Sequence, residues 1–292
     1  MIRLAPLLAL LAVLSLGLSA CQAQPQPPAG VKYHANVVYT KSGGEELKID
    51  IAHPEKEGEP RACILMIHGG GWRGGDKSHL TPVIFELAQQ GYTAATVQYR
   101  FAPKHRFPAQ IEDVKCAVRY LRAHAEEYGL DPERIGACGF SAGGHLSMIL
   151  GTMGKDDGFE GEGGWADQSS QVQAVLSYFG PTDFTLEYPA ASAAIVNDFV
   201  GFTLEENAEV RKQASPITYV SEGDAPMLLF QGTKDRLVPH EQAMVMAEAM
   251  TNAGIPGRVE LLIGFDHGWG GADLERTKKE TLEFFARHLG KK

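Results

Sequence analysis

The chain has 292 residues, 44% of them hydrophobic, and a formal net charge of −9 at pH 7. That length and hydrophobic content are sufficient for one large domain with a full core. The acidic balance, together with the lack of any basic run in the sequence, argues against nucleic acid as a partner.

The N-terminal segment MIRLAPLLALLAVLSLGLSAC is apolar, and Arg3 is its only charged residue. This pattern predicts a secretory signal peptide over residues 1–20. The letters LSAC at 18–21 resemble a bacterial lipobox, after which the cysteine is lipidated. We therefore expect Cys21 to carry acyl chains and to hold the protein at the cell envelope, at the outer membrane or in the periplasm. A plain signal peptide cut near Ala23 and a retained membrane helix are the alternatives.

The residues after Cys21 are rich in Pro and Gln, which predicts a tether over 21–34 rather than a folded element. No later segment of the sequence is long and apolar enough to span a membrane. The only membrane contact that we expect is therefore the N-terminal lipid anchor.

From residue 35 to 292 the pattern predicts one α/β domain. Segments 36–40 and 46–54 alternate like antiparallel strands joined by a Gly-Gly turn. Continuous apolar runs then alternate with helical patterns, as a parallel sheet covered on both faces requires. The expected strands are 62–69, 92–99, 134–140, 172–180, 226–232 and 258–264, and the expected helices are 79–90, 109–128, 142–153, 239–253 and 272–289.

Two segments interrupt this alternation. Residues 154–170 are glycine-rich and acidic, which predicts a mobile surface loop. Residues 184–214 follow a strand end and are partly helical in pattern, so they form either a lid over a site or a solvated surface excursion.

Three cysteines follow Cys21, and each falls within an apparent strand or helix. We expect Cys63, Cys116 and Cys138 to be buried free thiols, since an odd number inside core-like elements does not suit a disulfide scaffold. The sequence contains no Cys/His cluster at zinc-like spacing. We predict neither a metal nor a cofactor.

The segment IGACGFSAGG at 135–144 places a serine between glycines, after an apparent strand and before an apparent helix. In this context G-x-S-x-G forms a nucleophile elbow, which exposes the serine hydroxyl above the sheet. Gly139 and Gly143 permit the close approach of strand and helix that a Cβ would obstruct. Ser141 is thus a candidate nucleophile, and a glycine-rich turn without chemistry is the alternative.

A second glycine cluster, HGGGW at 68–72, directly follows another apparent strand. Consecutive glycines let backbone N–H groups point into a cavity, as stabilisation of an oxyanion requires. We predict Gly70 and Gly71 as donors together with Ala142, which follows the serine, and the N–H of Trp72 is a further candidate. His68 is expected to brace this loop.

A serine nucleophile needs a base and an acid that orients the base. His267 lies in the loop GFDHGWGG after the last expected strand, and Asp235 ends MLLFQGTKD at the tip of the strand before it. The order Ser141, Asp235, His267 is that of the α/β hydrolases. Asp183, which also follows a strand end, and Asp266, which adjoins the histidine, are the rival acids.

Five motifs together, HGGGW, YRFAPKHRFPAQIEDVKCAVRYLR, DPERIGACGFSAGGHL, ASPITYV and LLFQGTKDRLVPHEQA, resemble the α/β-hydrolase esterases with an HGGG motif. Within that group the chain is most similar to secreted bacterial acetyl- and feruloyl-esterase-like proteins, over roughly residues 35–290. The resemblance implies the α/β-hydrolase fold and the triad named above. It also implies that Arg100, Asp113 and the Ser215-Pro216 stretch are framework. The chain departs from the pattern before His267, where GFDH replaces the usual GxGH.

The expected function is therefore a serine carboxylic-ester hydrolase that acts on short-chain acetyl- or feruloyl-type esters, either small molecules or polysaccharides. We expect Trp72 and Phe140, with the segment 184–214, to shape the substrate pockets, and the Trp72 indole to narrow the acyl side beside the oxyanion site. A serine peptidase or arylformamidase of the same fold is one alternative. A non-catalytic surface-binding lipoprotein is an alternative of another class.

Overall fold

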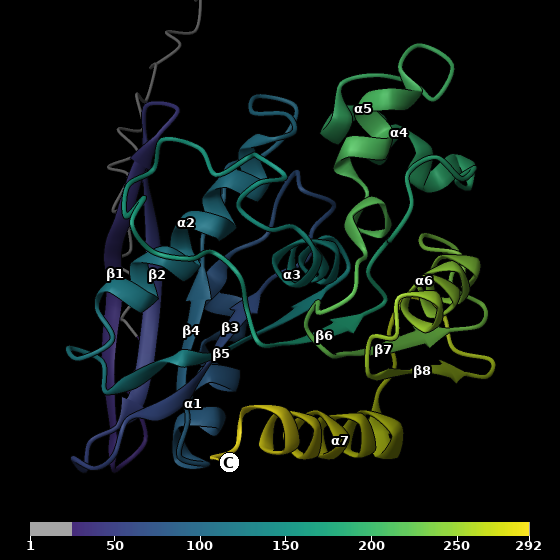
Figure 1. Ribbon diagram of the computed structural model, residues 1–292. Coiled ribbons are helices and arrows are strands. Elements are labelled where there is room, and N and C mark those ends of the chain that lie inside the picture. The colour runs from purple at the N-terminus through teal and green to yellow at the C-terminus, as the bar shows by residue number, and fades with distance from the viewer. Residues whose placement is uncertain (1–24, 292) are drawn as a thin grey trace, which may run out of the picture.

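The computed structural model describes residues 25–291, so the predicted signal peptide and Cys21 lie outside the described residues. Eight strands form one sheet in the order β1-β2-β4-β3-β5-β6-β7-β8 (Figure 1). The strands are β1 (Val31–Ser42), β2 (Glu45–Pro54), β3 (Arg61–Ile67), β4 (Thr93–Val97), β5 (Leu130–Phe140), β6 (Ala174–Tyr178), β7 (Met227–Gly232) and β8 (Gly257–Leu262). The helices are α1 (Thr81–Gln89), α2 (Ala109–Ala123), α3 (Ala142–Thr152), α4 (Ala190–Val200), α5 (Ala208–Ala214), α6 (Glu241–Asn252) and α7 (Gly271–Leu289), with 3₁₀ turns η1 (Lys77–Leu80) and η2 (Pro216–Tyr219).

The sheet is mostly parallel, which confirms the predicted fold class. Strand β2 runs antiparallel to both β1 and β4, and the remaining neighbours pair in parallel. The parallel strands β4, β6 and β7 are buried along their whole length, and β3 is buried after Arg61, because helices cover both faces of the sheet. Their carboxyl ends meet along one edge, where ligands bind in open α/β sheets.

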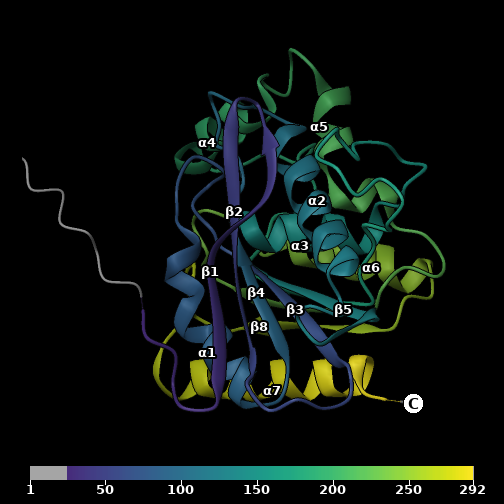
Figure 2. The ribbon, with the colours of Figure 1, turned by 90° about the vertical axis from the view of Figure 1, so that its left-hand side faces the viewer.

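Helices α1 and α7 cover one face of the sheet, and α2, α3 and α6 cover the other (Figures 1 and 2). Each face has its own hydrophobic core cluster. Helices α4 and α5 lie outside both layers, above the end of the sheet that holds β6 and β7 (Figure 1). Within the described residues no helix has both the length and the apolar character needed to cross a membrane.

The domain begins earlier than the sequence pattern predicts. Strand β1 starts at Val31, and its first residues pair with 51–54 of β2, so the predicted tether over 21–34 is wrong at its C-terminal end. A register shift lies between His34 and Val37, where Asn36 has φ 56°. The strand was predicted to begin at residue 36 because apolar and polar residues alternate from there. The irregularity at Asn36 breaks that alternation, so the earlier part of the strand was missed.

The acidic segment 154–170 is a surface loop without helix or strand, as predicted, and part of it is tied to the domain. It packs across α2, where the fully buried Lys115 ammonium lies 2.9 Å from Glu160 Oε1 and also donates to the Gly154 and Gly158 carbonyls. Arg119 pairs with the same carboxylate. Two buried cations of α2 require partners, and this loop supplies them.

The three cysteines that the structure describes are buried free thiols, as predicted. The Arg100–Asp113 pair also lies in the framework. The Arg100 backbone N–H donates to Asp113 Oδ2 over 2.8 Å, and its guanidinium binds the same carboxylate. This pair ties the chain after β4 to the first turns of α2.

Candidate active site

Ser141 occupies the sharp turn between β5 and α3. Its backbone has φ 54° and ψ −119°, a strained conformation for a residue with a side chain. A Cβ on Gly139 would lie 2.1 Å from the Gly143 carbonyl oxygen, and one on Gly143 would lie 2.1 Å from the Ile67 carbonyl oxygen. Both glycines are therefore needed for strand and helix to approach this closely, and the turn has the form of a nucleophile elbow.

The glycine loop after β3 lies against this turn. A Cβ on Gly69 would come within 3.3 Å of the Ser141 Cβ, and Gly70 and Gly71 have φ of 120° and 59°. Ala142 begins α3, and the first N–H groups of a helix have no partner within the helix. The predicted oxyanion donors thus lie on two segments that meet at Ser141, the glycine loop and the start of α3.

Asp235 and His267 meet at the ends of β7 and β8. His267 Nδ1 lies 2.7 Å from Asp235 Oδ2, and the carboxylate is completely buried while the imidazole is 18% exposed. A carboxylate can only accept, so Nδ1 carries the proton and Nε2 presents its lone pair. The backbone N–H groups of Leu237 and Val238 both donate to Asp235 Oδ1 over 2.9 Å, which fixes the carboxylate.

Gln231 is a further residue of the site that the sequence reasoning missed. It is buried in β7, and its Nε2 donates to Asp235 Oδ2 over 3.0 Å and to the Val238 carbonyl over 2.9 Å. Three donors besides the imidazole therefore hold the buried carboxylate. The available signal was a single polar residue inside the apolar run MLLFQG.

A close backbone approach brings the acid and base loops together. A Cβ on Gly232 would lie 2.4 Å from the Asp266 carbonyl oxygen, and the Lys234 N–H donates to the Phe265 carbonyl over 2.8 Å. A side chain at position 232 would therefore separate the loop that carries Asp235 from the loop that carries His267.

Both rival acids are engaged elsewhere. Asp266 accepts from the backbone N–H groups of Arg236 and His267 over 3.0 and 2.9 Å, and from Arg236 Nε over 2.6 Å. The Arg236 guanidinium, with these two N–H groups, lowers the pKa of Asp266 to about 2. Asp183 Oδ1 accepts from the backbone N–H and the hydroxyl of Thr185, which completes a local turn.

The two other histidines near the site have structural contacts. His68 is 3% exposed, stacks on Tyr99 and lies 2.7 Å from the Gly69 carbonyl through Nδ1, so it braces the glycine loop. His145 is fully buried: its Nδ1 accepts from the Trp72 indole over 3.2 Å, and its Nε2 donates to the Ala214 carbonyl over 2.8 Å. Burial lowers the pKa of His145 to about 4, so the ring stays neutral.

A cavity of about 380 Å³ opens over Ser141. Its wall includes Ser141, His267 and the glycine loop, and also residues of the segment 184–214. Within that segment, α4 lies so close that a Cβ on Gly71 would be 2.7 Å from Ile195 Cγ2. The remaining lining residues are mostly apolar: Trp72, Arg73, Phe140, Phe179, Pro181, Tyr188, Ser192, Val196, Leu237 and Val238.

Trp72 and Phe140 both border this cavity, but the Trp72 ring does not stand free in it. The Trp72 indole is 3% exposed, bonds His145 and stacks on Phe199 of α4 with ring centroids 4.4 Å apart. A buried indole N–H needs an acceptor, and His145 provides one on the interior side. The indole thus lines the cavity from an almost fully buried position with its N–H turned to the interior, and its effect on the acyl side stays a prediction. Phe179, which sequence reasoning missed, has its ring centroid 4.5 Å from that of His267.

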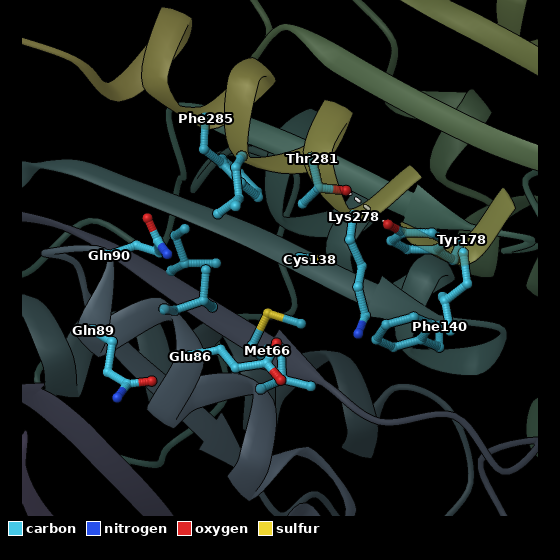
Figure 3. Close-up of a pocket in the computed structure, with 15 residues that line it drawn as sticks. Met66, Glu86, Gln89, Gln90, Cys138, Phe140, Tyr178, Lys278, Thr281 and Phe285 are labelled. Atoms are coloured by element: carbon cyan, nitrogen blue, oxygen red, sulfur yellow. Dashed lines mark hydrogen bonds between the residues drawn. The ribbon is translucent and has the colours of Figure 1, made fainter. Parts of the chain in front are cut away.

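A separate apolar cavity of about 280 Å³ lies on the opposite face, between α1 and α7 (Figure 3). Its floor includes Met66 and Cys138, and Phe140 contributes to the walls of both cavities. Burial raises the pKa of the Cys138 thiol well above its ordinary value, so this sulfur is a poor nucleophile. The residues that could perform covalent chemistry thus gather in the cavity over Ser141 instead.

Comparison with known proteins agrees with this architecture. Residues 49–250 match the BD-FAE family. Esterase LipC of Mycobacterium tuberculosis is 33% identical over 227 residues, which cover 75% of this chain and 56% of that protein. Ethyl acetate hydrolase of Pseudomonas putida is 26% identical, with coverage of 78% and 73%. The chain spans about half the length of the first curated relatives that it matches.

Solved structures give the same relationship. A truncated carbohydrate esterase from gut microbiota is 27% identical and superposes with a TM-score of 0.79, covering 89% of this chain and 97% of that one. The propionate-bound esterase Est2 of Thermogutta terrifontis is 27% identical with a TM-score of 0.74, covering 90% and 97%. The nucleophile elbow, the buried acid–base pair and these matches lead to one conclusion: the chain belongs to the BD-FAE family of α/β-hydrolase proteins.

Proposed function

We propose that this protein is a serine carboxylic-ester hydrolase with Ser141, Asp235 and His267 as its catalytic triad. One observation carries the proposal: Ser141, on a strained elbow, lines the same cavity as an imidazole whose Nδ1 is bonded to a buried carboxylate. That combination serves nucleophilic acyl transfer, and a binding protein has no need of it.

In the proposed reaction His267 Nε2 takes the hydroxyl proton as Ser141 Oγ attacks the ester carbonyl carbon. Negative charge develops on the carbonyl oxygen, where the N–H groups of Gly70, Gly71 and Ala142 stabilise it. The bond to the alcohol oxygen then breaks, and that oxygen leaves with the proton from His267. Water, deprotonated by the same imidazole, attacks the acyl-enzyme and releases the acid and free Ser141.

The proposed substrates are short-chain esters of the acetyl or feruloyl type, including those of polysaccharides. A cavity of about 380 Å³ with an apolar wall suits a small acyl group. The names of relatives support the same class, because they include an ethyl acetate hydrolase, a carbohydrate esterase and an esterase with bound propionate.

A hydrolysis panel tests the activity and its range. We expect p-nitrophenyl esters of C2–C4 to be cleaved fastest, with acetylated xylan and methyl ferulate tested in parallel. The Ser141→Ala variant is the control for each substrate. If wild-type protein cleaved none of these esters, or if Ser141→Ala retained the activity, the proposal would fail.

We also propose that Cys21 is lipidated and holds the enzyme at the cell envelope, at the outer membrane or in the periplasm. The motif LSAC and the Pro- and Gln-rich residues after it support this placement. Two or more acyl chains anchor a protein stably, whereas one chain is marginal. Wild-type protein should partition into detergent and Cys21→Ser should not; identical processing and partitioning of the two would contradict lipidation.

A further inference from the structure

A second hollow adjoins the cavity over Ser141 and shares the wall formed by His267. This outer groove, of about 500 Å³, is lined by Ala191, Arg236, Leu237, Asp266, His267 and Gly268. The cavity over Ser141, called the inner cavity below, shares only His267 and Leu237 with this groove. Ser141 and the glycine loop line the inner cavity and not the groove. An ester that reacts at Ser141 can therefore extend from the inner cavity past the shared imidazole into the outer groove.

The mechanism decides which part of an ester enters which space. His267 must deliver a proton to the leaving oxygen, so the alcohol lies on the imidazole side. The acyl carbon is bonded to Ser141 and its oxygen faces the glycine loop, so the acyl group lies in the inner cavity. The outer groove is consequently the space available to the alcohol.

Besides His267, the polar side chains of the outer groove form one ion pair. Arg236 Nε and Nη2 lie 2.6 and 2.5 Å from Asp266 Oδ2, and the Arg236 side chain is 85% exposed. A guanidinium has five N–H donors, so several remain for a ligand after this pairing. The exposed donors are held in one orientation, because Asp266 also accepts from the backbone N–H of His267 over 2.9 Å.

This chemistry suits a neutral alcohol that carries further hydroxyl groups. The charges of Arg236 and Asp266 cancel, so the groove has no net attraction for an alcohol that carries a charged group. Hydroxyls can accept from the free guanidinium N–H groups, while Ala191 and Leu237 offer an apolar surface to the C–H face of a ring. The opening to solvent leaves room for an alcohol that extends beyond the groove.

We propose that the groove bounded by Arg236 and Asp266 binds the leaving alcohol and that Arg236 selects polyhydroxylated alcohols over apolar ones of the same size. The inference rests on the proposed ester hydrolysis and adds the residue that determines alcohol specificity. Arg236 acts on the bound substrate by hydrogen bonding and takes no part in proton transfer.

The test compares two acetates that share the acyl group and a six-membered ring: a mono-O-acetyl methyl xyloside and cyclohexyl acetate. Arg236→Ala should lower the ratio of kcat/KM for the sugar ester to that for cyclohexyl acetate about tenfold, equivalent to about 1.4 kcal/mol. Arg236→Lys keeps the charge but loses the planar fork, so the ratio should fall by less. Lys234→Ala removes a nearby exposed charge that lines neither cavity and should leave the ratio unchanged.

A ratio that changes less than about threefold in Arg236→Ala would overturn the inference, whether both activities fall together or neither falls. Wild-type protein that a fluorophosphonate labels at Ser141 but that does not cleave the sugar ester would also overturn it, while the proposed function stands. Absence of labelling together with absence of any ester cleavage would instead refute the proposed function, and the role of the groove with it.

Discussion

His267 Nδ1 lies 2.7 Å from Asp235 Oδ2, and the carboxylate that it contacts has no exposed surface. A buried carboxylate in this position fixes the imidazole tautomer and stabilises the imidazolium that forms when the serine proton is taken up. The sequence separation of 32 residues between the two is bridged because β7 and β8 are parallel neighbours whose ends meet.

The first prediction concerns the triad as a unit. Ser141→Ala and His267→Ala should each lower kcat on the order of 10³-fold or more, and Asp235→Asn somewhat less. Because the two residues act in one proton transfer, the double variant should be barely slower than either single variant. Steady-state kinetics with p-nitrophenyl acetate measure this, and near-normal turnover by His267→Ala would contradict the assignment.

The second prediction concerns Gln231, which holds the Asp235 carboxylate without lining the cavity. Gln231→Leu removes a donor from a buried charge, so kcat should fall roughly tenfold while KM changes little. Gln242→Leu is the matched control: this buried glutamine accepts from the backbone N–H groups of Thr182 and Asp183 instead. Equal losses of kcat in the two variants would mean that Gln231 has only a structural role and does not position the catalytic carboxylate.

The third prediction links His145 to acid stability. Burial lowers its pKa from 6.5 to about 4 in the folded protein, so the unfolded state binds more protons between these values. The contribution of His145 to the free energy of unfolding should therefore be complete above pH 6.5. It should be lost as the pH falls towards 4, which amounts to on the order of 3 kcal/mol.

Denaturant unfolding at pH 7 and pH 5 measures the effect. His145→Gln should be less stable than wild type at pH 7 but should lose less stability on acidification. His240→Gln replaces a histidine whose side chain is 39% exposed and serves as the control. Its loss of unfolding free energy between pH 7 and pH 5 should equal that of the wild type. If His145→Gln lost as much unfolding free energy between pH 7 and pH 5 as the wild type, the acid sensitivity would arise from other groups.

The fourth prediction concerns acyl length. Ile195 lies over Gly71, so Ile195→Ala should enlarge the acyl side and flatten the decline in kcat/KM from C4 to C8, which we expect to be roughly tenfold in wild type. Ile217→Ala truncates a half-buried isoleucine that does not line the cavity and should retain the decline. A wild-type optimum at C8 or longer would exclude a short acyl site.

Trp72→Ala should act differently from Ile195→Ala. Its indole is 3% exposed and stacked on Phe199, so truncation should cost about 3–5 kcal/mol of unfolding free energy and lower Tm. If Trp72→Ala kept the wild-type Tm and changed only the chain-length profile, the wild-type indole would have to contact the acyl group directly.

The sequence predicted most of the fold because its signals are local. Buried parallel strands appear as continuous apolar runs, and the elbow at Ser141 is marked by glycines that close packing requires. The ends of strands in such a sheet meet at one edge, so the positions of Asp235 and His267 followed from the predicted topology.

What the sequence could not reveal depends on contacts between distant segments. The packing of 154–170 follows from the burial of Lys115 and its pairing with Glu160, 45 residues away. The direction of the Trp72 indole is set by His145, 73 residues away. Neither partner is marked by any spacing that a periodic pattern would show.

Everything proposed for this protein depends on Ser141 being an activated nucleophile. The most direct measurement is the intact mass of the protein after incubation with a fluorophosphonate, followed by peptide mapping. We expect one adduct per chain on the peptide that contains Ser141, with much slower formation in His267→Ala and no adduct in Ser141→Ala. A folded wild-type protein that gains no adduct, or an adduct that persists in Ser141→Ala, would contradict this role of Ser141.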